Sequence, residues 1–221
     1  CAALPAAELV DQPQPIKDPH YGDTLFHFFQ DHYCTSITTL MVSQHFDRVA
    51  QHRDEAEILR GGMLLSYGLH REAGQIFAQL IEKGASPSVR DRAWYYLAKI
   101  RYQRGLPAQA EAALARIEGR LPAALAEEHG LLQAQLRMAR GDFSGAADVL
   151  GRLADAKAPG ANAVPSLFAR YNLGVALVKS GDVARGSALL AAIGRAPADD
   201  EVPRSVRDRA DLALGVAAPQ A

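Results

Sequence analysis

A motif that returns four times along the chain constrains its fold more than any other feature. It is a glycine, a small residue five positions later, a bulky apolar residue four positions further on, and Leu or Ile after three more. The copies are Gly68-Ala73-Phe77-Leu80, Gly105-Ala110-Leu114-Ile117, Gly141-Ala146-Leu150-Leu153 and Gly181-Gly186-Leu190-Ile193. Their glycines are 37, 36 and 40 residues apart. A fixed period of this length is typical of stacked supersecondary units rather than of one closed globule.

Each copy predicts a pair of helices joined at the glycine. In residues 168–180 the apolar side chains recur at three- and four-residue steps, which places them on one helix face. Gly181 then allows the left-handed backbone that ends a helix. In the second helix, we expect the small residue Gly186 to let its partner helix cross closely and Leu190 to fill the space between adjacent hairpins. The sequence therefore predicts an all-α chain.

Two further segments extend the array. Residues 31–40 form a degenerate fifth copy, in the same frame and 37 residues before Gly68. At the other end, residues 205–210 repeat residues 88–93 letter for letter. We interpret this second segment as a lone closing helix, because the terminal units of stacked repeats need a more polar outer face.

The repeat resembles the tetratricopeptide repeat (TPR), whose usual period is 34 residues. The residues that carry the resemblance are Trp94, Leu97 and Ala98, Leu173 and Gly174, Ala73 and Phe77, and Pro122. The longer period of this chain departs from the family and places insertions in the turns between repeats. A generic array of helical hairpins is the alternative.

The resemblance implies a right-handed α-solenoid of about five helical hairpins, followed by a C-terminal capping helix. It covers residues 20–217. Residues 1–19 are rich in proline, which blocks regular structure and extends the chain, so we expect a tether there. Residues 218–221 are a short tail.

Composition limits the classes of partner. The chain has 24 basic and 25 acidic residues and a formal net charge of -1, which argues against a general nucleic-acid or anionic-membrane surface. Short charge clusters such as Arg90-Asp91-Arg92 indicate a solvated helix face. No apolar run approaches the roughly 18 residues that a membrane span needs.

The first residue, Cys1, suggests an anchor. Bacterial lipoproteins are cleaved directly before a cysteine that then carries the lipid, and the proline-rich segment after Cys1 suits a tether. We expect lipidation of Cys1, with Ala2 favouring the periplasmic face of the outer membrane. Cys34 then has no partner within the chain and is interpreted as a small buried apolar residue. A Cys1–Cys34 disulfide is the alternative if Cys1 is unmodified.

Neither catalysis nor a cofactor is expected. The sequence has no Gly-rich phosphate loop, nucleophile elbow, zincin pair or Cys-x-x-Cys motif. Six of seven histidines fall in the first seventy residues, which invites a metal hypothesis. However, helical metal ligands need spacings of three or four, and His27 and His32 are five apart. His27 and Asp31 can converge, but two ligands do not make a site.

Two surfaces are candidates for binding a protein partner. In the TPR family the first helices of successive hairpins line a groove, which here implies Arg92, Tyr95, Lys99, Tyr102, Gln103, Gln135, Tyr171 and Lys179. The second candidate is an aromatic interface in the first hairpin, formed by Tyr21, Phe26, Phe28, Phe29 and Tyr33. Helical spacing cannot bury Phe26, Phe28 and Phe29 on one face. The alternative is that the tether and the next hairpin bury these rings.

These features together predict a non-catalytic scaffold. We expect a periplasm-facing outer-membrane lipoprotein that holds or assembles an envelope complex for secretion, pili, polysaccharide export or the cell wall. Its partners would be envelope proteins, its only membrane contact the lipid on Cys1, and homo-oligomerisation is left open. The alternatives are a cytosolic adaptor or chaperone-like module, and a metal-binding accessory protein that uses the histidine-rich N-terminal hairpins.

Overall fold

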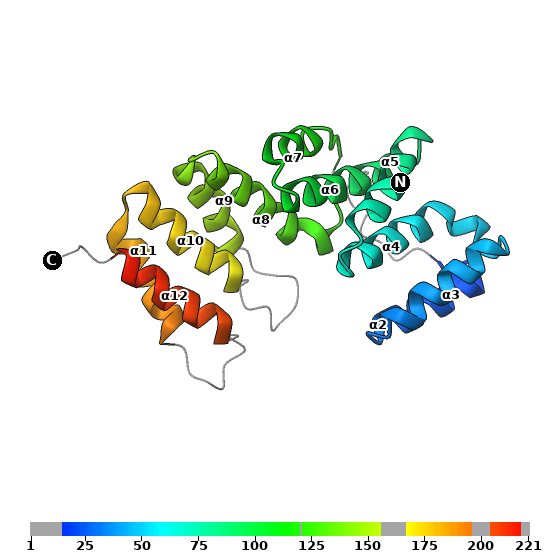
Figure 1. The fold of residues 1–221 in the computed structure, drawn as a ribbon, viewed down its shortest axis with the longest axis horizontal. Coiled ribbons are helices and arrows are strands. Elements are labelled where there is room, and N and C mark those ends of the chain that lie inside the picture. The colour runs from blue at the N-terminus through cyan, green and yellow to red at the C-terminus, as the bar shows by residue number, and fades with distance from the viewer. Residues whose placement is uncertain (1–14, 120, 156–166, 196–203, 218–221) are drawn as a thin grey trace, which may run out of the picture. The chain divides into compact units, whose positions relative to one another are not determined.

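A computed structural model of the chain describes residues 15–119, 121–155, 167–195 and 204–217. These residues form eleven α-helices and one 3-10 helix without a β-strand, so the all-α prediction is confirmed for them (Figure 1). In chain order the elements are α2 (Pro19–Phe29), α3 (Tyr33–His45), η1 (Ala50–His52), α4 (Arg53–Ser66), α5 (His70–Glu82), α6 (Pro87–Gln103), α7 (Pro107–Leu114), α8 (Ala123–Ala139), α9 (Phe143–Asp155), α10 (Leu167–Ser180), α11 (Val183–Gly194) and α12 (Arg204–Ala217).

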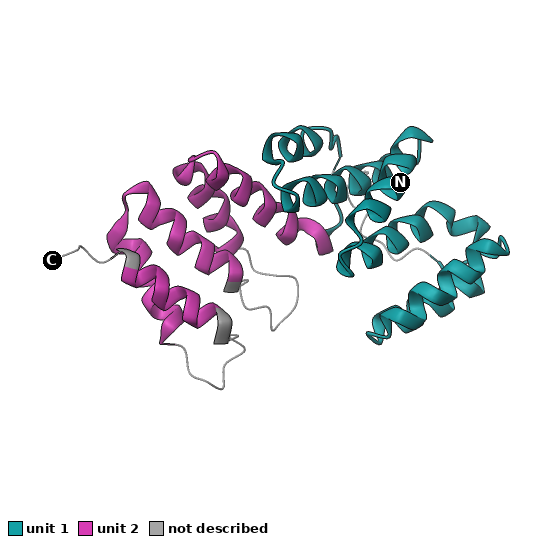
Figure 2. Cartoon of the chain, in the orientation of Figure 1, with its two compact units in different colours: residues 1–123 teal, residues 124–221 magenta. Residues whose placement is uncertain are grey.

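The chain divides into two compact units, residues 1–123 and residues 124–221 (Figure 2). Helices α2 to α7 belong to the first unit, and α8, apart from its first residue, to α12 belong to the second. In each unit helices that follow one another pack together; α8 and α9 do so through a shared hydrophobic cluster. Helix α4 also contacts α6, as α10 contacts α12. Cys1, most of the expected tether and the tail at 218–221 lie outside the described residues.

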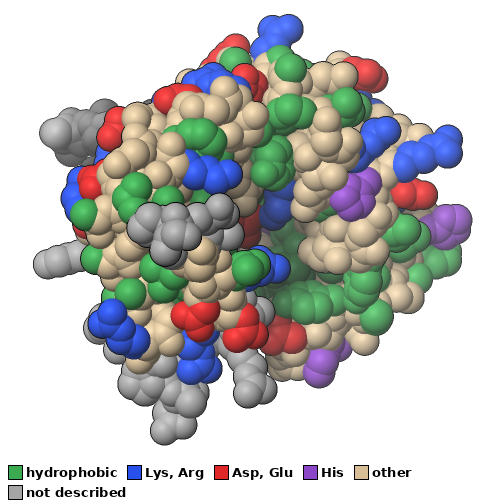
Figure 3. Space-filling view, turned by 60° about the vertical axis from the view of Figure 1, so that its left-hand side comes forward, with side chains coloured by type: hydrophobic (Ala, Val, Ile, Leu, Met, Phe, Trp, Pro, Cys, Tyr) green, Lys and Arg blue, Asp and Glu red, His purple; other side chains and the backbone are tan. Residues whose placement is uncertain are grey.

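Charged side chains of both signs are mixed on the face of the molecule that Figure 3 shows. On the face drawn in Figure 3, basic and acidic side chains are interspersed with apolar ones, without a large area of one sign. This distribution agrees with a formal net charge of -1. Electrostatic attraction of a strongly charged polymer is therefore not a feature of this face.

The turn residues follow the predicted frame. Gly68, Gly105, Gly141 and Gly181 lie between the two helices of their hairpins, with φ angles of 77°, 73°, 84° and 100°. Asp31 holds the same place between α2 and α3, with a φ of 60°. Aspartate tolerates this left-handed conformation better than most residues. The prediction of a left-handed turn is thus confirmed at Gly181 and extends to the degenerate copy.

The two helices of a hairpin cross at small residues. A β-carbon built on Gly186 would lie 2.7 Å from the carbonyl oxygen of Gly174, so the predicted close crossing is confirmed there. In the first hairpin the residues of the same frame are Ser36 and Thr24. The Ser36 hydroxyl donates a hydrogen bond of 2.9 Å to the Thr24 carbonyl oxygen. In both hairpins the residue of the first helix lies seven positions before the turn residue. The residue of the second helix lies five positions after it.

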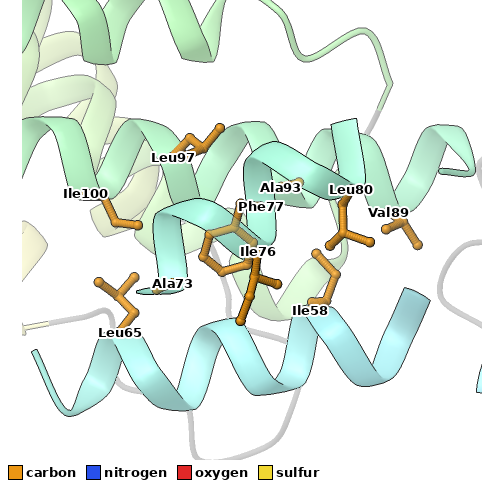
Figure 4. Packing of buried hydrophobic residues seen from close by; sticks show 10 residues of the cluster. All are labelled: Ile58, Leu65, Ala73, Ile76, Phe77, Leu80, Val89, Ala93, Leu97 and Ile100. Atoms are coloured by element: carbon orange, nitrogen blue, oxygen red, sulfur yellow. The ribbon is translucent and has the colours of Figure 1, made fainter. Parts of the chain in front are cut away.

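A bulky residue of the second helix then fills the space beside this crossing. Phe77 of α5 is fully buried, and a β-carbon on Gly61 of α4 would lie 2.6 Å from its ring. Tyr96 of α6 stacks on the Phe77 ring, with the two centroids 4.9 Å apart. Figure 4 shows the surrounding cluster, which consists of Ile58, Leu65, Ala73, Ile76, Phe77, Leu80, Val89, Ala93, Leu97 and Ile100. Phe77 therefore joins its own hairpin to α6, as the sequence predicts.

The crossing in the second unit can be tested by adding one methyl group. We expect Gly186→Ala to lower the free energy of unfolding by about 1–2 kcal/mol, because overpacking outweighs the gain in helix propensity. Gly151 inside α9 is the matched control, since a β-carbon there would meet no atom within 4 Å. Gly151→Ala should raise the free energy of unfolding by up to about 1 kcal/mol. Urea unfolding of both variants measures the difference, and a neutral Gly186→Ala would contradict the close crossing.

Candidate partner-binding surfaces

Four exposed aromatic side chains lie around the turns of the first two hairpins. They are Phe26 and Phe29 on α2, Tyr33 at the start of α3, and Tyr67 directly after α4, and we call them the aromatic surface. Their exposed fractions are 60%, 78%, 41% and 50%. Phe26 and Phe29 are one helical turn apart, so they share a side of α2. Rings this exposed add little to the core of the chain.

Contacts between side chains link and support this surface. Phe28 packs on the core of the first hairpin and meets both Phe29 and Tyr33 edge-on, with centroid distances of 5.5 Å in each case. Cys34 and Tyr67 share a hydrogen bond of 3.1 Å between the thiol and the phenol oxygen. This bond links the turns of the two hairpins, and Phe29 and Tyr33 rest on the packed Phe28.

Hydrogen bonds raise the pKa of the two phenols on this surface. Tyr33 donates a bond of 2.5 Å to a carboxylate oxygen of Asp31, and this bond raises the pKa of Tyr33. The bond to Cys34 raises the pKa of Tyr67. A phenol is neutral at pH 7 even with its ordinary pKa of about 10, and the two raised pKa values extend this neutral state to higher pH.

Cys34 is exposed, so its interpretation as a buried apolar residue is wrong. The residue lies in the first turn of α3, where its side chain faces Tyr67 and not the core.

Two of the five residues predicted for the aromatic interface have a packing role instead. Tyr21 is only 8% exposed and belongs to the core of the first hairpin. Its ring stacks on the ring of His52, with the centroids 4.8 Å apart. Phe28 is half-buried and supports its neighbours. We therefore retain Phe26, Phe29 and Tyr33 and leave Tyr21 and Phe28 out of the candidate surface.

Two of the five groove residues predicted on α6, Tyr95 and Arg92, have structural contacts instead. Tyr95 is fully buried, so it has no surface to offer a partner. Arg92 forms an ion pair of 2.5 Å with Glu55 of α4, and its side chain is 16% exposed. Lys99 and Tyr102 are half-buried, and Gln103 is exposed. Of the five, the last three keep surface that a ligand can reach.

The remaining predicted groove residues belong to the second unit. Gln135 on α8 is half-buried. Tyr171 on α10 is half-buried and packs on the cluster around Leu190. Lys179 is exposed, and its ammonium group lies 5.3 Å from the centre of the Phe143 ring.

The charge cluster Arg90-Asp91-Arg92 is not a solvated face. Asp91 is 2% exposed and accepts hydrogen bonds from the backbone N–H groups of Glu118 and Gly119, at 3.2 and 2.8 Å. Arg92 pairs with Glu55, as described above. The cluster therefore fixes the start of α6 to its neighbours.

The histidine-rich end shows structural roles as well. His52 accepts a hydrogen bond of 2.9 Å from the backbone N–H of Lys17, and Asp18 accepts bonds from the N–H groups of Gln51 and His52. Among the described residues, no three His, Cys, Asp or Glu side chains are grouped so that they can hold a metal ion.

Sequence reasoning missed Tyr67. Its position could have revealed it, because Tyr67 lies directly before the turn residue Gly68. Tyr33 lies equally close to a turn, two residues after the equivalent residue Asp31. Residues at these positions lie at the same end of adjacent hairpins.

Comparisons with known proteins do not assign the chain to a family. No family model, curated protein or solved structure matches it. None of the helices in the described part of the chain has the length and hydropathy that a bilayer span requires.

The packing role of Tyr21 predicts a loss of stability at high pH. Burial, aided by the nearby Glu55 and opposed by Arg92, raises the pKa of Tyr21 from 10.0 to about 12. Because the folded state holds this proton more tightly, the stabilisation is complete below pH 10 and is lost as the pH rises through about 12. We expect Tyr21→Phe to lack this component in urea unfolding measured at several pH values. An equal loss in both proteins would show that Tyr21 does not cause it.

Proposed function

We propose that the chain is a non-catalytic scaffold that binds other proteins through preformed helical surfaces. The observation that carries the proposal is the exposure of Phe26 and Phe29, at 60% and 78%, beside the exposed Tyr33 and Tyr67. Water contact with large clustered rings is unfavourable, and such patches mark interaction sites in soluble domains.

The aromatic surface suits a partner with apolar groups on its own surface. Aromatic side chains bring large contact area with few rotatable bonds, so little conformational entropy is lost when they bind. The packed Phe28 beneath Phe29 and Tyr33 limits their motion further. The neutral phenol groups of Tyr33 and Tyr67 add polar contacts that can orient the partner.

We also propose that the hairpins form a right-handed α-solenoid of tetratricopeptide type. Supporting this are the shared frame of turn and crossing residues and the contacts of α4 with α6 and of α10 with α12. The groove that this arrangement implies stays a prediction, now limited to Lys99, Tyr102, Gln103, Gln135, Tyr171 and Lys179.

The cellular setting that we propose is the periplasmic face of a bacterial outer membrane, with the chain anchored through a lipid on Cys1. The support is the proline-rich composition of residues 2–19, which suits an extended tether. In that setting the partners are components of an envelope complex.

Removing the exposed rings should abolish partner capture without unfolding the chain. We expect Phe26→Ser with Phe29→Ser to deplete the proteins that the tagged wild type retains from solubilised membranes of its host. Thermal unfolding should change little, because both rings are exposed. The control is Val183→Ser on α11, which is 43% exposed and should retain the partners. Unchanged capture by the double variant would remove the aromatic surface from the proposal.

The anchor is tested separately by intact mass. We expect the protein purified from host membranes to carry a lipid-sized mass addition, and Cys1→Ser to lack it and to leave the membrane fraction. An unmodified wild-type protein in the soluble fraction would contradict the proposed location and leave the scaffold proposal standing.

A further inference from the structure

Helix α3 differs from the other helices in that it carries no charged side chain. None of its residues is Asp, Glu, Lys or Arg, whereas every other α-helix that the structure describes contains at least one. One side of α3 is buried in the first hairpin through Ser36, Leu40 and Ser43. The centres of protein interfaces are depleted of charged residues, so the exposed side of α3 has the composition of an interface. It consists of Cys34, Thr35, Thr38, Met41, Val42 and His45, which we call the α3 face.

The second helices of the other hairpins show that this exposure is not an effect of the chain end. Ten and eleven residues after its turn residue, α3 has Met41 and Val42, which are 50% and 48% exposed. The residues at the same two positions in α5, α9 and α11 and at the end of α7 are small or polar, and each is exposed or half-buried. A solvated face needs residues of this kind, so the large apolar pair is specific to α3. The equivalent pairs are Ala78 and Gln79, Ala115 and Arg116, Gly151 and Arg152, and Ala191 and Ala192.

The described residues that precede α2 leave the α3 face open. A β-carbon built on Gly22 of α2 would lie 3.5 Å from the side chain of Ile16. The backbone N–H of Lys17 donates its hydrogen bond to His52 of η1. This part of the chain therefore contacts α2 and η1, and the α3 face remains exposed beside it.

The α3 face is complementary to itself in an antiparallel arrangement. Cys34, Thr38, Met41 and His45 follow one another at steps of four, three and four, an order that is the same from either end. When Thr38 of one copy lies opposite Met41 of another, Cys34 lies opposite His45, and two-fold symmetry repeats both pairs. Each large side chain of the second half then meets a small one of the first half, as close packing requires. Because the face carries no acidic side chain, Lys or Arg, contact with itself creates no like-charged pair from these residues.

We propose that the α3 face binds the same face of a second copy of the chain, with the two α3 helices antiparallel. This contact removes Met41 and Val42 of both copies from water. Tyr33 of the aromatic surface lies at the start of α3. Antiparallel pairing therefore places the aromatic surfaces of the two copies at opposite ends of the helix pair. The pairing does not depend on the function proposed above, because self-association and partner capture are measured separately.

Sedimentation velocity of the Cys1→Ser variant, which cannot carry the lipid, measures self-association. We expect a dimer whose dissociation constant rises at least about tenfold in Met41→Glu and in Val42→Glu, since each change removes an apolar contact. Ala192→Glu on α11 is the matched control, because Ala192 is exposed at the frame position of Val42. It should leave the dissociation constant unchanged. Far-UV circular dichroism checks that all three variants fold, which is expected because the three residues are exposed.

A disulfide tests the direction of the two helices. Cys34 and a cysteine at position 45 are about 16 Å apart along one helix, too far for a bond within the chain. In the antiparallel dimer they lie opposite each other, so His45→Cys in the Cys1→Ser background should form covalent dimers under mild oxidation. The Cys1→Ser parent should form few, because its two Cys34 thiols are about 16 Å apart in the dimer. Arg195→Cys, exposed at the same frame position of the fifth hairpin, is the control for random collisions.

The proposal is overturned by any of three results. A chain that stays monomeric up to about 0.1 mM would leave the α3 face to the tether or to another protein. A dimer that neither glutamate variant weakens would use a different surface. Covalent dimers of the parent, or of Arg195→Cys in a yield equal to that of His45→Cys, would contradict antiparallel pairing through α3.

Discussion

The close approach of two helices at a pair of small residues is the constraint on which the other features of each hairpin depend. Gly174 and Gly186 bring two backbones within contact distance, and Leu190 reaches its buried position only because Gly174 has no side chain. Thr24 and Ser36 achieve the same crossing with a hydrogen bond from a hydroxyl to a carbonyl. The crossing thus requires small size rather than glycine itself. The turn between the two helices contains a residue with a left-handed backbone in all five hairpins, at Asp31, Gly68, Gly105, Gly141 and Gly181.

Much of the hairpin could be predicted because its determinants are local in sequence. Turn glycines and crossing residues recur at fixed offsets, and even Asp31 obeys the frame without being glycine. The burial of Tyr95 and Tyr21 could not be predicted in this way. A first helix of an internal hairpin packs on more than one neighbour, so an aromatic residue off the main apolar face can still be covered. His52, which covers Tyr21, comes from a different element, 31 residues away.

The polar residues show why candidate sites are harder to predict than helices. Asp91 and Asp18 are almost fully buried, yet their carboxylates accept N–H groups from the backbone of connecting segments. Helix ends and connections leave such donors without partners inside the helix, and a buried donor needs an acceptor. A cluster of charges on a helix therefore stabilises a turn as readily as it binds a ligand, and only the geometry separates the two roles.

The large apolar side chains that are exposed differ widely in how exposed they are. The most exposed among those described are Phe29 in the first hairpin and Leu212 on the last helix, at 78% and 71%. A helix that served only as a polar cap would gain from a charged residue in place of Leu212. It would also gain from Ala in place of Gly215, since glycine inside a helix costs about 1 kcal/mol relative to alanine. Helix α12 instead retains the small residue and the apolar residue of a crossing face.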